Sequence, residues 1–229
     1  MLREVAFVGG CATALLVTDP AAAAVRVTDD VDVIVEIASY AEYARFSKRL
    51  CALGFSEDST EGAPICRWLI DGMKLDVMPT DRKVLGFSNR WYKPALRYAA
   101  MISIDDLKLR IVTAPYFIAT KLEAFRGRGQ GDIYASSDLE DIITVVDGRP
   151  SLVEEISNSP ALLRNYISME IAKFLDSREF VNALAGHLAG DEISQARIRS
   201  VLRTLNSLRA LGSKRTRTTT LARRRNPRR

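Results

Sequence analysis

The chain has 229 residues, enough for one large domain or for a domain with a helical appendage. Its residues are 47% hydrophobic and 27% charged, a composition typical of globular proteins. No apolar run approaches the roughly 18–20 residues that a membrane span needs. The N-terminus leads into a strand-like run without the pattern of a cleaved signal peptide. We therefore expect a cytoplasmic protein that does not associate with membranes.

The net charge of +5 is unevenly distributed along the chain. Eight of the 33 basic residues lie between Lys214 and Arg229, where no acidic residue occurs, so the other 25 face 28 acidic residues. The body is thus mildly acidic, and residues 213–229 are predicted to form a disordered basic tail. The tail could hold RNA or DNA through phosphate contacts, or it could be a solvated end without a specific role.

Histidine and cysteine content limits the chemistry. His187 is the only histidine, which excludes histidine-dependent triads and multi-histidine zinc sites. Cys11, Cys51 and Cys66 are widely spaced in apolar contexts, so we expect buried thiols rather than a disulfide or zinc set. If the protein is an enzyme, carboxylates, lysines and metal must carry the reaction.

The N-terminal pattern predicts a strand at Glu4–Val8, a turn at Gly9-Gly10, a short helix at Cys11–Val17 and, after a loop over residues 18–29, a strand at Asp30–Glu36. Because side chains alternate along a strand, Asp30 and Asp32 should share one face while valines bury the other. Their α-carbons would lie about 6.5–7 Å apart, a span that one or two divalent cations can bridge. A carboxylate pair on an apolar strand is costly to bury without positive compensation.

A third strand carboxylate follows from a hairpin. Ser39 and Glu42 have capping-box spacing, which predicts a helix from Tyr40 to about Leu53. Asp71-Gly72 is then the strongest short hairpin signal, joining strands at Ile65–Ile70 and Met73–Met78. The two-residue turn places Arg67 directly opposite Asp76.

The remaining elements are mostly helical. A strand is predicted at Leu107–Val112, and Pro115 favours a helix that starts near Thr113, carries Lys121 on a half-buried face and ends near Phe125. Ser137 and Glu140 form a second capping box that opens a helix ending near Gly148. Four more helices are predicted at residues 152–157, 161–175, 178–184 and 193–211. The organisation expected is a mixed α/β core over 1–150, a C-terminal helical region over 151–212 and the tail.

These features together indicate two-metal nucleotidyl transfer. Gly9-Gly10 would let backbone amides and the following helix approach a triphosphate. Asp30, Asp32 and Asp76 would hold two Mg²⁺ ions, with Mn²⁺ as a possible substitute. Lys121 needs an anionic partner, which could be Asp138 or Asp141 structurally or a nucleotide phosphate functionally.

The sequence resembles the DNA-polymerase-beta-like nucleotidyltransferase superfamily, and within it the AbiEii/AbiGii-type toxin family. The resemblance covers roughly residues 5–150 and rests on five segments: Phe7–Ala12, Arg26–Asp32, Lys74–Pro79, Lys121–Arg126 and Ser137–Asp141. Gly-Gly and Asp-x-Asp are weak motifs singly. Their order here, with Lys121 and two aspartates on successive helices, makes the combination specific.

The resemblance implies an α/β nucleotidyltransferase core that binds NTP and Mg²⁺ and transfers NMP to a hydroxyl acceptor, which in toxin members can be the 3′ end of tRNA. It also implies a cognate antitoxin protein. Asp30, Asp32, Asp76 and Lys121 would be catalytic, and the nucleotide would lie against Gly9, Gly10, Arg26, Thr28, Lys121, Asp138 and Asp141.

Each assignment has an alternative. Asp76 could be only the partner of Arg67, Gly9-Gly10 only a tight turn, Arg26 a surface residue, and Asp138 a helix-dipole contact. Two rival functions also stand: a small-molecule nucleotidyltransferase of the antibiotic-modifying type, and a non-catalytic nucleic-acid-binding protein.

Overall fold

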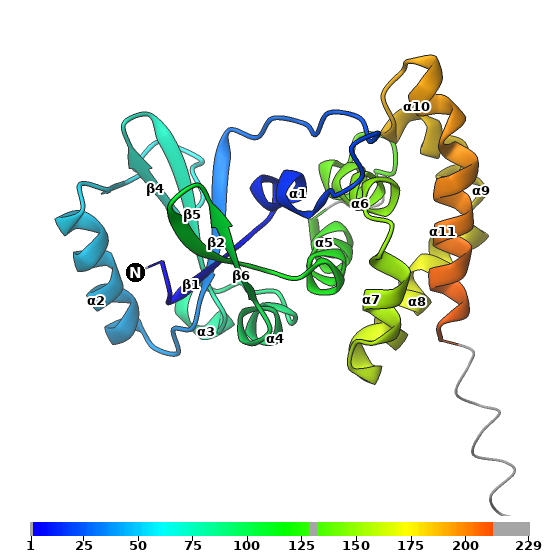
Figure 1. The fold of residues 1–229 in the computed structure, drawn as a ribbon. Coiled ribbons are helices and arrows are strands. Elements are labelled where there is room, and N and C mark those ends of the chain that lie inside the picture. The colour runs from blue at the N-terminus through cyan, green and yellow to red at the C-terminus, as the bar shows by residue number, and fades with distance from the viewer. Residues whose placement is uncertain (1, 129–131, 213–229) are drawn as a thin grey trace, which may run out of the picture.

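The computed structural model describes residues 2–128 and 132–212. The predicted disordered tail lies outside the described residues. The described chain forms a seven-stranded mixed sheet with helices on both faces and a C-terminal group of helices (Figure 1). This confirms the predicted α/β architecture.

The sheet has the order β3-β4-β5-β2-β1-β7-β6. The strands are β1 (Val5–Val8), β2 (Asp30–Val35), β3 (Ser56–Glu57), β4 (Arg67–Ile70), β5 (Met73–Pro79), β6 (Ala100–Ile104) and β7 (Leu107–Ile111). Two central pairs are parallel, β2 with β5 and β1 with β7, and the other pairs are antiparallel. The carboxylate-bearing strands β2 and β5 are therefore neighbours in the interior of the sheet.

The two faces of the sheet belong to two hydrophobic clusters. Val33 and Val35 of β2 pack with Trp68 on the face covered by helix α2 (Tyr40–Ala52). Ile34 packs on the opposite face, in the larger cluster that contains helix α5 (Ala114–Arg128). Because side chains alternate, Asp30 and Asp32 lie on the same face as Ile34. The predicted division of β2 into a carboxylate face and a valine face is confirmed.

The Asp71-Gly72 hairpin has the predicted register. Both turn residues have positive φ, 47° and 78°, as a two-residue hairpin turn requires. Ile70 pairs with Met73, and Arg67 pairs with Asp76. A local turn signal thus fixes which side chains face one another at the other end of the hairpin.

The N-terminal helices follow the predictions with changes at the caps. Helix α1 (Gly10–Leu16) starts one residue earlier than expected. Ser39 caps α2 by accepting from the Glu42 amide, but Glu42 reaches back to the Ala38 amide rather than to that of Ser39. In helix α6 (Ser137–Gly148) the cap is Ser136, so the predicted Ser137–Glu140 capping box was wrong by one residue.

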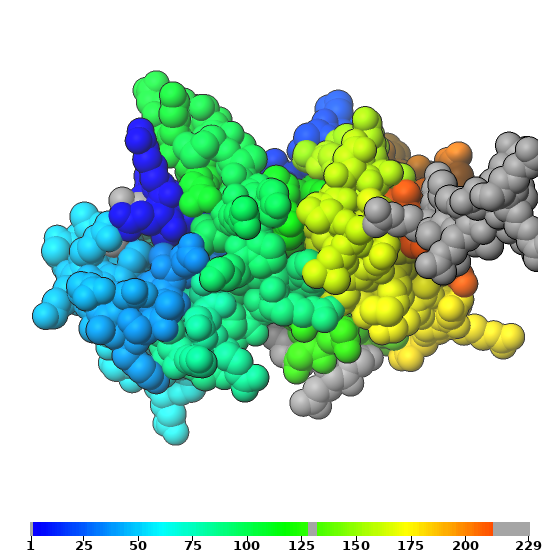
Figure 2. Space-filling model, turned by 90° about the horizontal axis from the view of Figure 1, so that it is seen from below, coloured from blue at the N-terminus to red at the C-terminus, as the bar shows by residue number. Residues whose placement is uncertain are grey.

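The C-terminal helices are α7 (Leu152–Ser157), α8 (Ala161–Asp176), α9 (Arg178–Ala183), α10 (Glu192–Ala196) and α11 (Ile198–Ala210). The single helix predicted over 193–211 is two helices, separated at Arg197. One hydrophobic cluster runs from Ala6 of the sheet to Leu211, so these helices share the main core. In Figure 2 the yellow helices border the green middle part of the chain.

Several elements of the described chain were not predicted, among them the short strand β3 and a 3-10 helix at Leu184–His187. Strand β6 pairs with β7 at the edge of the sheet, and the short helices α3 (Arg82–Leu85) and α4 (Tyr92–Arg97) follow β5. Trp91, at the N-terminus of α4, is buried against Tyr116 and Tyr166.

Candidate functional site

The three predicted strand carboxylates lie on one face of the sheet. Asp32 of β2 is aligned with Asp76 of the parallel strand β5, while Asp30 is aligned with Lys74. Neighbouring strands are about 4.7–4.9 Å apart, and aligned side chains point to the same face. Asp76 is 8% exposed and the side chain of Asp30 is 36% exposed, so the carboxylates extend from the sheet interior toward its rim.

Arg67 joins two of these carboxylates. Its Nε donates to Oδ1 of Asp76 at 2.8 Å, and one terminal nitrogen donates to Oδ2 of Asp76 at 2.8 Å and to Oδ2 of Asp30 at 3.0 Å. The side chain of Arg67 is only 16% exposed. The hydrogen bonds that Arg67 donates to Asp76 outweigh burial and raise the pKa of Arg67, so the guanidinium is a permanent cation within the carboxylate group.

Gly9 provides the close approach between the first turn and Asp32. Its φ is +72°, and a Cβ at this position would lie 1.8 Å from Oδ2 of Asp32. A Cβ on Gly10 would lie 2.5 Å from Cγ2 of Thr28 and 3.6 Å from a guanidinium nitrogen of Arg26. The glycine pair therefore does more than form a tight turn. Because neither residue has a Cβ, the side chains of Asp32, Thr28 and Arg26 can approach the backbone of the turn.

Lys121 lies on α5 between two aspartates of α6. Its ammonium nitrogen is 3.1 Å from Oδ1 of Asp138 and 2.6 Å from Oδ2 of Asp141. All three side chains are at least nine-tenths buried. Burial alone would lower the pKa of Lys121, but the charges and hydrogen bonds of Asp141 and Asp138 outweigh it and raise the pKa. The structural partner expected for Lys121 is present.

Arg26 and Thr28 lie at the end of the loop between α1 and β2. Arg26 approaches Glu140 at 3.4 Å and Asp141 at 3.7 Å, while the Thr28 hydroxyl donates to the backbone oxygen of Asp30 at 3.2 Å. Arg26 thus extends the Lys121 ion-pair group toward Gly10. All ten predicted site residues are linked through these contacts and strand alignments.

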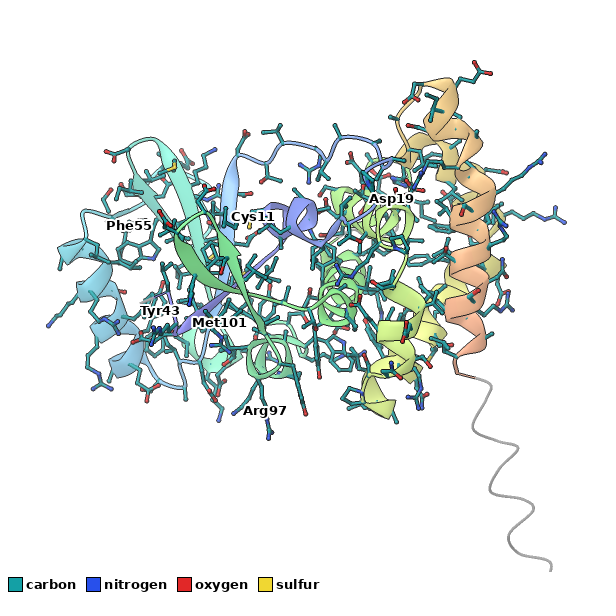
Figure 3. All side chains as sticks on the ribbon, in the orientation of Figure 1. Cys11, Asp19, Tyr43, Phe55, Arg97 and Met101 are labelled. Carbon is teal, nitrogen blue, oxygen red and sulfur yellow. The ribbon has the colours of Figure 1, made fainter. Side chains whose placement is uncertain are left out.

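A residue of the C-terminal region anchors the same loop. Arg197 donates to Oδ2 of Asp19 at 2.6 Å, to both carboxylate oxygens of Asp147 at 2.8 and 2.9 Å, and to the backbone oxygen of Ala21 at 3.4 Å. Asp19 lies next to the C-terminal helices (Figure 3). The sequence did not indicate this contact, since 178 positions separate Arg197 from Asp19.

A small cavity is lined by both Asp32 and Lys121. Its volume is about 50 Å³, and its lining includes Gly9, Asp32, Tyr92, Thr120 and Lys121. Cys11 is close by, with its thiol donating to the Val8 backbone oxygen at 3.1 Å. Burial, reinforced by the charges of Asp32 and Asp30, raises the pKa of Cys11 to about 11, so the thiol stays protonated near neutral pH. Cys66 is buried as predicted, but Cys51 is exposed, which was not expected.

The strand aspartates have the kind of ligand atoms that a divalent cation requires. Aspartate oxygens are the ligands that Mg²⁺ prefers, and the space left by Gly9 allows Asp32 to lie against the first turn. Within residues 2–128 and 132–212, however, no three acidic, histidine or cysteine side chains are grouped closely enough to hold an ion as they stand. The guanidinium of Arg67 between Asp30 and Asp76 separates the potential ligands.

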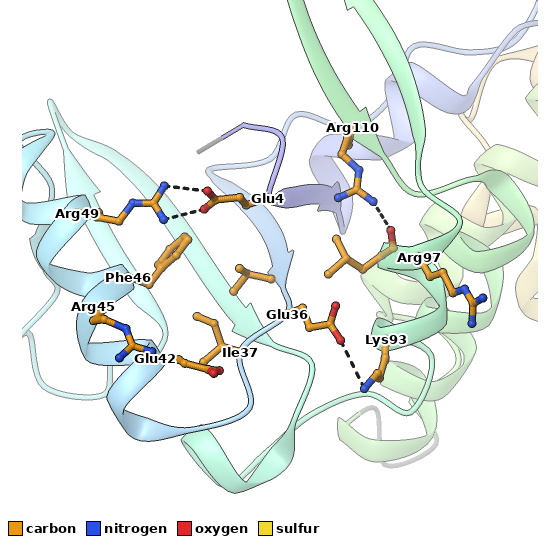
Figure 4. A pocket seen from close by; sticks show the side chains of 12 residues that line it. Glu4, Glu36, Ile37, Glu42, Arg45, Phe46, Arg49, Lys93, Arg97 and Arg110 are labelled. Carbon is orange, nitrogen blue, oxygen red and sulfur yellow. Dashed lines mark hydrogen bonds and ion pairs between the residues drawn. The ribbon is translucent and has the colours of Figure 1, made fainter.

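A larger cavity lies at the other end of β2. It has a volume of about 650 Å³ and is lined by charged residues of α2, α4 and the strand ends (Figure 4). Its glutamates have partners: Glu4 pairs with Arg49 at 2.8 Å and Glu36 pairs with Lys93 at 3.4 Å. None of the predicted site residues lines it, so we place the candidate site at the carboxylates despite its smaller cavity.

His187 has a structural role in the described part of the chain. It is buried, and its Nε2 lies 2.7 Å from the backbone oxygen of Ile133.

Within residues 2–128 and 132–212, no helix combines the length and apolar character needed to cross a bilayer. Comparison of the sequence with models of known protein families and with curated proteins found no match.

Proposed function

We propose that the protein is a Mg²⁺-dependent nucleotidyltransferase that moves NMP from an NTP to a hydroxyl acceptor and releases pyrophosphate. The observation that carries the proposal is the alignment of Asp32 with Asp76 on one sheet face, beside Asp30 and against Gly9. Carboxylates on neighbouring inner strands are costly to bury, and a cation-dependent reaction accounts for them.

The residues would divide the work as follows. Asp30, Asp32 and Asp76 would hold Mg²⁺, which when bound activates the acceptor hydroxyl and neutralises the leaving pyrophosphate. The backbone of Gly9 and Gly10 would lie against the triphosphate.

The charges on the helices would act on the phosphates. Lys121 lines the same small cavity as Asp32, so a buried ammonium group faces the space beside that carboxylate. Asp138 and Asp141 hold that group in one position. Arg26 and Thr28 would reach the nucleotide from the loop above Gly10.

We further propose that the acceptor is RNA, with the 3′ end of tRNA as the first candidate, and that the protein acts in the cytoplasm as a toxin restrained by an antitoxin protein. The support is the motif order of the sequence and the eight basic residues between Lys214 and Arg229, since basic segments hold nucleic acid through phosphate contacts.

The test is incubation of the protein with each α-³²P-labelled NTP, Mg²⁺ and, in separate reactions, tRNA, total RNA, protein or aminoglycosides. Labelled tRNA is the expected product. Asp32→Asn should abolish this transfer. Asp106→Asn is its matched control and should label tRNA like wild type, because Asp106 is an exposed aspartate in the β6–β7 turn. Labelled aminoglycoside alone would instead establish a small-molecule acceptor, and label in no acceptor would reject the proposed reaction.

A further inference from the structure

Arg67 contacts two of the three residues that would hold metal, and this affects how many ions the site can take. We propose that the Arg67 guanidinium takes the place of one cation, so that the protein without nucleotide binds a single divalent ion, through Asp30 and Asp32. This inference rests on the proposed function for the identity of the ligands, but its test does not require transfer activity.

Geometry supports this role for Arg67. Both oxygens of Asp76 accept from Arg67, at 2.8 Å each, in the paired arrangement that makes arginine–carboxylate contacts strong. The two residues are opposite one another in the β4–β5 ladder, so strand register rather than a loop holds them together. An ion that used Asp76 would have to displace this guanidinium from a position where it is largely shielded from water.

The charge balance of the site also indicates a single divalent ion. With three ionised aspartates and Arg67, the group carries a net formal charge of −2, which one divalent cation neutralises. A second divalent cation would leave a surplus of +2 in a half-buried site, which is unfavourable. The neighbouring cations do not reduce this negative charge, because Lys121 and Arg26 pair with three other carboxylates, those of Asp138, Asp141 and the half-buried Glu140.

The ligands proposed for the single ion, Asp30 and Asp32, lie on β2 directly beside the Arg67–Asp76 pair. Arg67 contacts one carboxylate oxygen of Asp30, namely Oδ2. Asp32 borders the small cavity against Gly9, and the cavity volume of about 50 Å³ exceeds the ~10–15 Å³ that one water molecule requires. An ion there could keep part of its water shell, as Mg²⁺ usually does.

Titration with Mn²⁺, followed by the electron paramagnetic resonance signal of the free ion, measures the stoichiometry directly. We expect one ion per wild-type chain. Arg67→Met should bind a second ion at least about tenfold more tightly than wild type, because the Arg67 cation no longer competes with that ion for Asp76. A charge within about 4–6 Å of a carboxylate changes its proton-binding equilibrium by one or more powers of ten, and we expect an effect of similar size on metal binding. Arg67→Lys, which keeps the charge, should remain at one ion.

Two variants serve as controls. Arg199→Met removes an exposed arginine of α11 and should bind one ion like wild type. Asp32→Asn should bind none with comparable affinity. If Arg67→Met does not fold, the wild-type count together with Asp32→Asn still decides the question.

Two ions, or none, in the wild-type protein would overturn the inference. Two ions together with Mg²⁺-dependent transfer would leave the proposed function standing while the role of Arg67 fails. One ion without transfer to any acceptor would leave the role of Arg67 standing while the proposed function fails.

Discussion

Oδ2 of Asp32 occupies the space that a side chain at position 9 would need. An ideal Cβ on Gly9 would lie 1.8 Å from this oxygen, and the φ of +72° is itself unfavourable for any other residue. The first strand and the carboxylate strand therefore meet at a point where only glycine fits.

Gly9→Ala should displace Asp32 and reduce nucleotidyl transfer at least 100-fold, since a shift of about 1 Å in a reacting geometry can cost that much. Gly62→Ala is the matched control: Gly62 has a φ of +82° but no atom within 4 Å of its added Cβ. Both variants should lose stability from backbone strain, measured by urea unfolding. Equal transfer by the two variants would show that the Gly9–Asp32 contact does not matter for the reaction.

Lys121→Met should lower the free energy of unfolding by about 3–5 kcal/mol, because it leaves Asp138 and Asp141 buried without their cation. Lys108→Met, at an exposed position of β7, should change it by less than about 0.5 kcal/mol. Chemical denaturation measures both. A Lys121→Met protein as stable as wild type would contradict the ion-pair arrangement.

Arg197→Met tests whether the C-terminal helices position the loop that carries Arg26. The variant should raise the KM for NTP more than it lowers kcat, because the loop carries Arg26 and Thr28 of the proposed nucleotide site, whereas the strand carboxylates are held by the sheet. Arg197→Lys, which keeps the charge, should recover part of the affinity. The exposed Arg199→Met is the control and should resemble wild type. A loss confined to kcat would argue against positioning of the loop by Arg197.

We expect the buried Cys66 thiol to make the protein less stable at alkaline pH. Burial, aided by the charge of Asp76, raises its pKa from 9.0 to about 12. The unfolded chain would lose this proton above pH 9 while the folded protein keeps it, so the stabilisation is complete below pH 9 and disappears as pH rises toward 12. The contribution of Cys66 alone to the free energy of unfolding should fall by at most about 1.4 kcal/mol per pH unit in this window. Cys66→Ala should flatten that decline between pH 9 and 10.5, and an unchanged slope would contradict the assignment.

Local signals explain which parts of the fold were predictable. Asp71-Gly72 gave the β4–β5 register because a two-residue turn with positive φ fixes the pairing of both strands. The turn between β6 and β7 has the same length, and Asp105 has a φ of 49°, but Asp106 follows it instead of glycine. Without the glycine the second hairpin lacked a recognisable turn, and β6 was missed.

Long-range contacts of the site could be predicted only in part. Lys121 and its aspartates were paired because a half-buried lysine requires an anion and the aspartates follow on the next helix. The contact of Arg67 with Asp30 depends on β2 lying next to β5, and the contact of Arg197 with Asp19 depends on how the C-terminal helices pack. Neither arrangement leaves a local pattern in the sequence.

The most direct test of the central claim is transfer of label from α-³²P-NTP to tRNA by wild-type protein and by Asp32→Asn, with Mg²⁺ present or replaced by EDTA. We expect labelled tRNA only with wild-type protein and Mg²⁺. The Asp32→Asn protein should remain folded, and Mg²⁺ should raise the Tm of the wild type alone. Labelling by Asp32→Asn at the wild-type rate, or in the presence of EDTA, would contradict the assignment of the strand carboxylates as the catalytic site.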